Sequence, residues 1–168
     1  MTNAARALRD LEIRPAALED LDELLEIYLS SAQHHVALDP DHYRVPDPDA
    51  AAERLRGIIE DDGRMSGYLA AAADGRIVGS VSIALLPPPS EGSMMAAVPT
   101  AELGIAVLDD ARDAGVGTAL MAAAEAWAGA RGVRVIILDM SARNVAAKRF
   151  YERLGYEVNG LFLRKAIG

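Results

Sequence analysis

Apolar and polar positions follow two different rhythms in the first third of the chain, and each rhythm predicts a different element. Residues 11–14 alternate apolar and polar side chains before Pro15, which is typical of a short strand. From Leu18 onward, apolar residues recur at helical spacing while acidic residues occupy the other side, which predicts an amphipathic helix. Residues 34–48, rich in Asp, Pro and His, are expected to form a loop. A second helix is expected from Pro48 or Asp49 to Glu60, with Asp47 or Asp49 near its N-cap.

A hairpin follows in the pattern. Residues 67–73 and 76–85 are both strand-like, and they flank Asp74-Gly75, a strong signal for a two-residue turn. The proline-rich stretch 87–99 then interrupts the regular structure. Its apolar residues Met94, Met95 and Val98 lead us to expect that this loop packs against the body as adaptable apolar filler beside the acceptor site.

The second half alternates strand and helix. Strands are expected at 101–107 and 133–138, and helices at 115–129 and 144–154. The run 133–138 is nearly all β-branched or apolar, which is typical of a central strand covered on both sides.

A last hairpin is expected where 156–158 and 161–163 flank Asn159-Gly160. We find no internal repeat or low-complexity tract. The pattern as a whole predicts one mixed α/β domain over residues 1–168.

Composition narrows the classes of partner and chemistry. The chain has 168 residues, 51% of them hydrophobic, with 17 Lys and Arg against 25 Asp and Glu. The net charge of −8 argues against a nucleic acid or an anionic membrane as the main partner. The absence of cysteine excludes disulfides, thiolate catalysis and cysteine-ligated metals. No apolar run is long enough to span a membrane and the first residues lack the core of a secretory signal, so we expect a soluble cytoplasmic protein.

The acidic excess is confined to the N-terminal part. Residues 1–64 carry 7 basic and 15 acidic side chains, whereas residues 65–168 carry ten of each. One interpretation is a solvated helix face together with turn residues. The other is an acidic rim that attracts a cationic substrate.

The segment from Val107 to Leu120 carries the clearest chemical signal. A strand leads into a loop with Gly115 and Gly117, and a helix begins there; unpaired helix N–H groups and nearby glycines form a cradle for a phosphate. A P-loop needs Lys followed by Ser or Thr after its second glycine, and a dinucleotide fingerprint needs a glycine where Leu120 stands. Both of those sites are disfavoured. The alternative is that the two glycines simply begin a well-packed helix.

At this point the chain resembles a known family. Arg112-Asp-Ala-Gly-Val-Gly117 is similar to the R-x-x-G-x-G pyrophosphate loop of the GCN5-related N-acetyltransferases (GNAT), which bind acetyl-coenzyme A. Asn144-x-x-Ala-x-x-Phe-Tyr151-x-x-x-Gly-Tyr156 is similar to the helix signature of the same family. Asp113 departs from the pattern, because a glycine usually follows the arginine, and we expect its carboxylate to face solvent or pair with Arg112.

The resemblance implies a fold and a cofactor site. It implies a mixed, mostly antiparallel sheet flanked by helices, whose parallel middle strands splay apart to admit acetyl-coenzyme A. It implies that the loop binds the pyrophosphate, that strand 105–107 pairs with the pantetheine arm, and that a helix-start asparagine bonds that arm. The implied cofactor-binding residues are Ile105, Ala106, Val107, Arg112, Asp113, Ala114, Gly115, Val116, Gly117, Thr118 and Asn144.

Tyr151 is the candidate general acid. It lies two helical turns from Asn144, and a phenol can protonate a departing thiolate; alternatively, Tyr151 belongs to the apolar stripe of its helix. Glu102 and Asp139, at the ends of neighbouring strands, are candidate bases for the amine, and a water chain without a dedicated residue is the third option. Metal binding by His34, His35 and His42 is disfavoured because no ligand spacing is met, so no metal is expected.

The expected function is transfer of acetyl from acetyl-coenzyme A to a primary amine by direct attack in a ternary complex. Without cysteine no thiol nucleophile exists, although a serine route stays open. The acceptor is expected between the N-terminal helices, about 17–62, and loop 87–99, with the cofactor on a core of about 101–158. A cationic small molecule, a polyamine, an aminoglycoside-like compound and a peptide amine are all compatible acceptors. The alternative is a non-catalytic acyl-coenzyme A sensor; the family also commonly forms homodimers.

Overall fold

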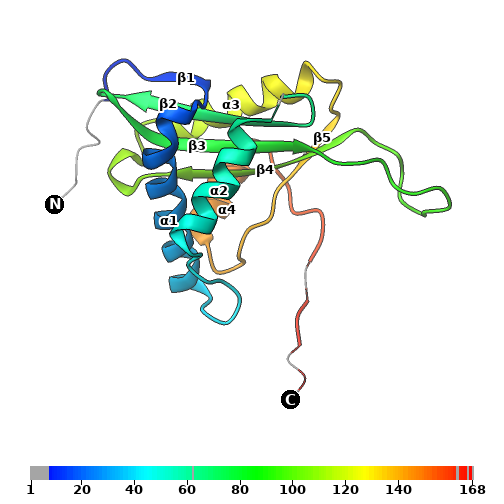
Figure 1. The fold of residues 1–168 in the computed structure, drawn as a ribbon. Coiled ribbons are helices and arrows are strands. Elements are labelled where there is room, and N and C mark those ends of the chain that lie inside the picture. The colour runs from blue at the N-terminus through cyan, green and yellow to red at the C-terminus, as the bar shows by residue number, and fades with distance from the viewer. Residues whose placement is uncertain (1–7, 62, 162, 166, 168) are drawn as a thin grey trace.

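The protein is described by a computed structural model over residues 8–61, 63–161, 163–165 and 167. Across these residues the sheet runs in the order β1-β2-β3-β4-β5, and neighbouring strands are antiparallel except β4 and β5, which are parallel. The predicted mixed α/β architecture is therefore confirmed (Figure 1). The strands are β1 (Glu12–Pro15), β2 (Ser66–Ala73), β3 (Arg76–Leu85), β4 (Thr100–Val107) and β5 (Val135–Ile137).

Helices cover both faces of this sheet (Figure 1). One face packs against α1 (Leu21–Leu38), which follows the 3₁₀ turn η1 (Leu18–Asp20), and against α2 (Pro48–Ile59). The other face packs against α3 (Val116–Gly129), which follows η2 (Asp109–Ala111), and against residues of α4 (Val145–Arg153). Two apolar clusters result. The first is centred on Leu24, Ile27 and Leu55, and the second on Val81, Leu120 and Met121.

Local signals predicted the β2–β3 hairpin and the start of α2 correctly. Asp74 and Gly75 form the turn with φ of 52° and 78°, as a tight hairpin of this type requires. The Asp47 carboxylate caps α2 by accepting hydrogen bonds from the backbone N–H groups of Asp49 and Ala50, at 3.1 and 3.0 Å.

The predicted loop from His34 was wrong at its beginning. Helix α1 continues to Leu38, so His34 and His35 lie on its last turns. Nothing before Pro40 interrupts the helix, because the polar residues at 33–35 carry no backbone restriction. This extension brings both imidazoles to the functional cavity described below.

The C-terminal part departs most from expectation. The run 133–138 was predicted to be a central, fully covered strand, but β5 is three residues long and lies at the edge, with Val135 and Ile137 43% and 40% exposed. The predicted hairpin around Asn159-Gly160 is also wrong within the described residues, which form no strand after β5; Phe162 lies outside them.

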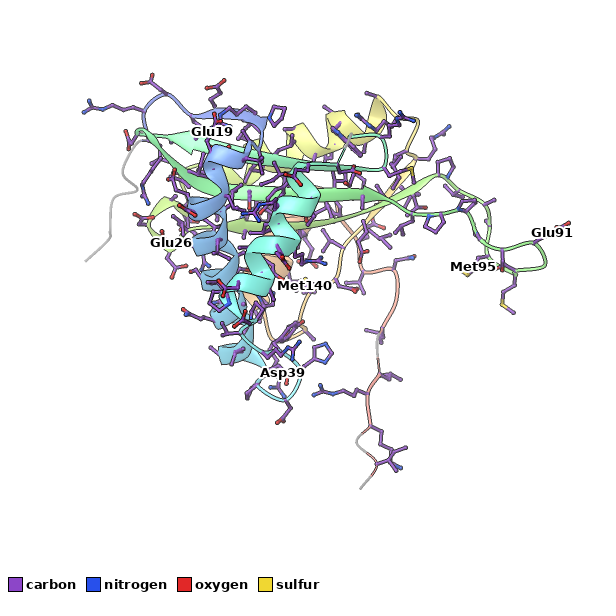
Figure 2. All side chains as sticks on the ribbon, viewed as in Figure 1. Glu19, Glu26, Asp39, Glu91, Met95 and Met140 are labelled. Atoms are coloured by element: carbon purple, nitrogen blue, oxygen red, sulfur yellow. The ribbon has the colours of Figure 1, made fainter. Side chains whose placement is uncertain are left out.

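The loop at 87–99 was predicted to pack against the body, and it does not. It extends well away from the sheet as an arm between β3 and β4 (Figures 1 and 2). Met94 and Met95 near its tip are 98% and 70% exposed. We call residues 86–99 the β3–β4 arm.

Candidate active site

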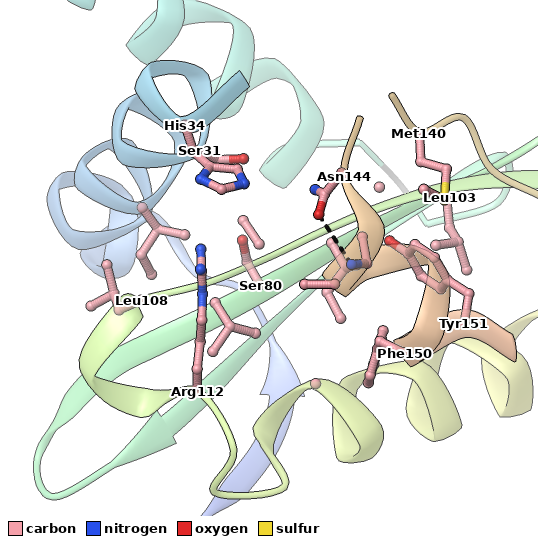
Figure 3. Close-up of a pocket in the computed structure, with 18 of the residues that line it drawn as sticks. Ser31, His34, Ser80, Leu103, Leu108, Arg112, Met140, Asn144, Phe150 and Tyr151 are labelled. Atoms are coloured by element: carbon pink, nitrogen blue, oxygen red, sulfur yellow. Dashed lines mark hydrogen bonds between the residues drawn. The ribbon is translucent and has the colours of Figure 1, made fainter. Parts of the chain in front are cut away.

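A cavity of about 680 Å³ lies where the two halves of the chain meet. One wall comes from α1, with Ser31 and His34, and the opposite wall comes from α4, with Asn144 and Tyr151 (Figure 3). Strand β4 runs between these walls and contributes residues 103–107. The loop that leads to α3 closes one end.

A gap in the sheet opens into this cavity. Strand β4 pairs with β5 only at its beginning, where Thr100, Ala101 and Glu102 face β5. Among the described residues, the remainder of β4 has no strand on that side, although it pairs with β3 along its whole length on the other. Residues 103–107 therefore offer backbone groups on one edge to whatever enters the cavity, and an extended ligand arm fits such an edge.

The start of α3 forms the cradle predicted from the glycines. Gly115 is the N-cap residue with φ of 84°, and no side chain caps the helix. The first N–H groups of a helix have no carbonyl partner within the helix, so they are available to bind an anion. Gly117 lies close to α4, since a Cβ there would be 3.1 Å from the Phe150 ring, a tight contact. Gly115, Gly117 and Thr118 all line the cavity.

Arg112 and Asp113 flank this cradle. Both line the cavity and both are exposed. The Arg112 guanidinium pairs with Asp109 at 2.8 Å rather than with Asp113, and it extends toward the α1 wall (Figure 3). Asp113 has φ of 60°. Of the two arrangements expected from the sequence, solvent exposure or pairing with Arg112, Asp113 adopts solvent exposure.

Asn144 and Tyr151 come together on the α4 wall. The Asn144 Oδ1 caps α4 by accepting a hydrogen bond from the Ala147 N–H at 3.0 Å (Figure 3). The Tyr151 hydroxyl points into the cavity (Figure 3). Burial raises the pKa of the Tyr151 phenol above its ordinary value near 10, so the phenol is protonated at neutral pH.

The two candidate bases lie in different places. Asp139 follows β5 and lines the cavity. Glu102 is exposed at the point where β4 still pairs with β5, and it does not line the cavity.

The sequence did not single out the buried polar pair that the sheet contributes to the cavity. Tyr68 from β2 and Ser80 from β3 line the cavity, and their hydroxyls lie 3.2 Å apart. Ser80 is only 4% exposed, and burial raises the pKa of Tyr68 despite this hydrogen bond. The available signal was a serine at the centre of the apolar run of β3. Such a residue carries a cost unless its hydroxyl is satisfied.

The N-terminal acidic residues do not form a rim around the cavity. Asp20 accepts two hydrogen bonds from Arg14, both at 2.7 Å, and the Glu23 carboxylate accepts the Ile77 N–H at 2.8 Å. These carboxylates hold α1 against β1 and β3. Of the described residues that line the cavity, the carboxylates are Asp113 and Asp139.

Within the part of the chain that the structure describes, no group of three or more His, Asp or Glu residues is arranged to hold a metal ion. No described helix has both the length and the apolar character needed to cross a membrane.

Comparison with known proteins places this geometry in a family. The acetyltransferase (GNAT) family matches residues 21–156, which is most of the chain. Among curated proteins, none matches. A mutant of the BH1408 protein from Bacillus halodurans has a similar structure, with a TM-score of 0.85 at 23% identity over 93% of this chain and 99% of that one.

Two structures of an aminoglycoside N-acetyltransferase, AAC(6')-Iy, are also similar. One, in complex with CoA, has a TM-score of 0.69 at 25% identity over 96% of this chain and 98% of that one. The other, in complex with the bisubstrate analog CoA-S-monomethyl-acetylneamine, has a TM-score of 0.67 at 26% identity over 94% and 99%. The uncapped start of α3 and the open edge of β4 fit the pyrophosphate and the extended arm of coenzyme A. The chain is therefore a member of the GNAT acetyltransferase family, an enzyme that takes its acetyl group from acetyl-coenzyme A.

Proposed function

We propose that this enzyme acetylates a primary amine by direct attack of the amine on the thioester while both substrates are bound. The observation that carries the proposal is that one cavity joins the gap beside β4, the start of α3 and the Tyr151 hydroxyl. Acetyl-coenzyme A supplies an activated acyl group with a thiolate leaving group. The AAC(6')-Iy structure with a bisubstrate analog supports a site that holds donor and acceptor together.

The chain's own residues divide the work of binding. In this proposal the backbone of 113–118 holds the pyrophosphate, and Arg112 adds positive charge to it. The free edge of 105–107 pairs with the pantetheine arm and orients the carbonyl. The Asn144 side-chain amide still has its N–H donors after capping α4 with its oxygen, and we assign one of them to the same arm.

Tyr151 donates the proton that the departing thiolate takes. Its raised pKa keeps the proton in place until the thiolate forms, and its hydroxyl faces the cavity (Figure 3). Asp139 is the base that we favour, directly or through water, because it lines the cavity and Glu102 does not. Ser80 is disfavoured as a nucleophile, since its hydroxyl is already paired with Tyr68.

The α1 wall indicates the class of acceptor. Tyr28, Ser31 and His34 offer hydroxyl and imidazole groups there, and Tyr68 from β2 and Ser80 from β3 add hydroxyls from the sheet. The carboxylates that line the described cavity are Asp113, in the cofactor loop, and Asp139, so none lies on the α1 wall. We therefore propose a small amine with neutral hydrogen-bonding groups rather than a polycation, bound against residues of about 17–62 and not against the β3–β4 arm. We also propose that residues 1–168 form one domain working in the cytoplasm.

A screen of amines tests this function. Released coenzyme A is measured as free thiol, and the chain adds no background because it has no cysteine. We expect turnover with hydroxylated monoamines, and we expect spermidine and an aminoglycoside to have lower kcat/KM. No turnover across the panel, with acetyl-coenzyme A still bound, would instead support the sensor alternative.

A tyrosine variant then tests the mechanism with the amine so identified. Tyr151→Phe should lower kcat by about 100-fold or more while leaving the Kd of acetyl-coenzyme A unchanged. The matched control is Tyr156→Phe, because the Tyr156 hydroxyl bonds Glu125 at 3.1 Å outside the cavity. Equal rates for Tyr151→Phe and the control would remove Tyr151 from the chemistry.

A further inference from the structure

A second cavity, of about 590 Å³, lies between α1, α2 and the loop that joins these helices. The two helices lie side by side over the same face of the sheet (Figure 1). Three residues line both cavities, namely Tyr28, Ser31 and His35, and their helical spacing places them along one side of α1. The second cavity therefore borders the α1 wall of the first, against which we propose that the acceptor binds.

Hydrogen bonds at both ends of the joining loop hold it in place. At its start, the Asp39 carbonyl accepts the backbone N–H groups of His42 and Tyr43, at 3.2 and 3.1 Å. At its end, the Asp47 carboxylate caps α2. The loop thereby turns back onto α1, and the centroid of the Tyr43 ring lies 4.9 Å from that of His35 and 4.7 Å from that of His42. These three rings give the second cavity an aromatic wall.

The charge that faces the second cavity is positive, although the segment around it is acidic. Residues 39–54 include five acidic side chains, yet no carboxylate among the described residues lines this cavity. Arg44, from the loop, and Arg54, from α2, do line it. Over the described residues, neither guanidinium has a hydrogen-bond or ion-pair partner. Two arginines without a partner beside one cavity favour an oxyanion, because each planar guanidinium can donate two parallel hydrogen bonds to it.

The two cavities together suit a substrate whose ends carry opposite charges. In the first cavity, Tyr151 lies on the α4 wall opposite α1, and Asp139 comes from the segment that leads to α4. An amine that reacts beside these two groups can extend the rest of its molecule toward α1 and the second cavity. A cationic far end would be repelled there by the two arginines, whereas an anionic far end would be attracted.

We infer that the acceptor is an amine whose far end carries an oxyanion, a carboxylate or a phosphate, and that Arg44 and Arg54 bind this oxyanion in the second cavity. The aromatic wall contacts the part of the acceptor next to the oxyanion, and the hydroxyl and imidazole groups of α1 face its middle. Amines without the oxyanion remain substrates but lack this contact. The inference rests on the proposed acetylation of an amine, and it adds the charge at the other end of the substrate.

Matched sets of amines test the inference by turnover. The panel contains the ω-aminoalkanoates from γ-aminobutyrate to ω-aminocaprylate, their primary amides, and aminoalkyl phosphates of the same lengths. At the best chain length, kcat/KM for the carboxylate or the phosphate should exceed that for the amide by about 10-fold or more, and the faster anion identifies the oxyanion. The ratio should fall to near one in the double variant Arg44→Gln, Arg54→Gln. Arg56→Gln is the matched control and should keep the wild-type ratio, because Arg56 is exposed on α2 and lines neither cavity.

A binding measurement separates this inference from the proposed chemistry. The N-acetyl forms of the same compounds have no free amine, so their affinity does not depend on turnover. In calorimetry with coenzyme A bound, the N-acetyl carboxylate or phosphate should bind about 10-fold more tightly than the N-acetyl amide, and the double variant should lose this preference.

Equal affinity for anion and amide, no measurable binding of either, or a preference that survives in the double variant would overturn the inference. So would an anion that binds without competing with the amine substrate, since it would then occupy a separate site. The expected binding preference without turnover of any amine would instead contradict the proposed acetylation and leave the oxyanion site standing.

Discussion

Asn144 shows how one side chain serves both the fold and the site. Its Oδ1 caps α4, and its N–H donors remain for a ligand in the cavity. A sequence signature cannot separate these two roles, because both call for asparagine at the same position. Substitution can separate them, since aspartate retains the oxygen that caps the helix and lacks the amide N–H donors.

We therefore predict that Asn144→Asp and Asn144→Ala differ. Asn144→Ala should lower the free energy of unfolding by about 1 kcal/mol, the usual value of an N-cap, and should weaken acetyl-coenzyme A binding as well. Asn144→Asp should keep the stability of the wild type but bind the cofactor more weakly. Urea unfolding and calorimetry measure the two effects. Cofactor affinity that survives in Asn144→Asp would limit Asn144 to capping.

At the scale of elements, the link between β1 and α1 depends on the Arg14–Asp20 ion pair. Asp20 is 4% exposed and accepts hydrogen bonds from Arg14 and from the Ala17 backbone N–H. The hydrogen bonds from Arg14 lower the pKa of Asp20, and they outweigh the opposing effect of burial. A carboxyl whose folded pKa is depressed stabilises the fold fully above its unfolded pKa of about 3.9, and that stabilisation is lost as pH falls through the folded value.

The predicted consequence is a pH-dependent cost of Asp20→Asn. At pH 7 the variant should be less stable than the wild type by about 1–3 kcal/mol, and the difference should shrink as pH falls below 4. Asp22→Asn is the control, because Asp22 is exposed at the start of α1. Urea unfolding at pH 7 and pH 3 measures both variants. A difference that does not change with pH would show that the ion pair does not contribute in this way.

Elements set by local chemistry were the ones the sequence predicted well. The Asp74-Gly75 turn and the Asp47 cap each depend on a few adjacent residues, and both were found as expected. The cradle at Gly115 and Gly117 is local in the same sense. The end of α1 was missed because the polar residues near 34 do not themselves stop a helix, and the next proline is Pro40.

Elements set by distant pairing were predicted poorly. The apolar pattern of 133–138 does not indicate which segment lies beside this strand. The described residues after Tyr156 do not form a strand there. The pair that β2 and β3 contribute to the cavity was missed for a similar reason. Tyr68 and Ser80 acquire a role only because hairpin register places them together, facing α1.

At the scale of the whole molecule, the site exists because the sheet stops pairing partway along β4. Helix α1 supplies one wall, and the α3 loop and α4 supply the others. Among the acidic residues of the first 64, Asp20 and Glu23 hold α1 in place and Asp47 caps α2. The proposed acetyl transfer thus requires that the free edge of 103–107 and the uncapped start of α3 bind one continuous ligand.

Hydrogen exchange with and without acetyl-coenzyme A measures this directly. Peptides covering 103–108 and 113–118 should both exchange more slowly when the ligand is bound, because free backbone N–H groups gain acceptors there. A peptide from β2, which is paired on both sides, is the internal control and should not change. ATP and NAD should give no comparable protection. Protection by acetyl-coenzyme A that spares both segments, or equal protection by ATP, would contradict the account.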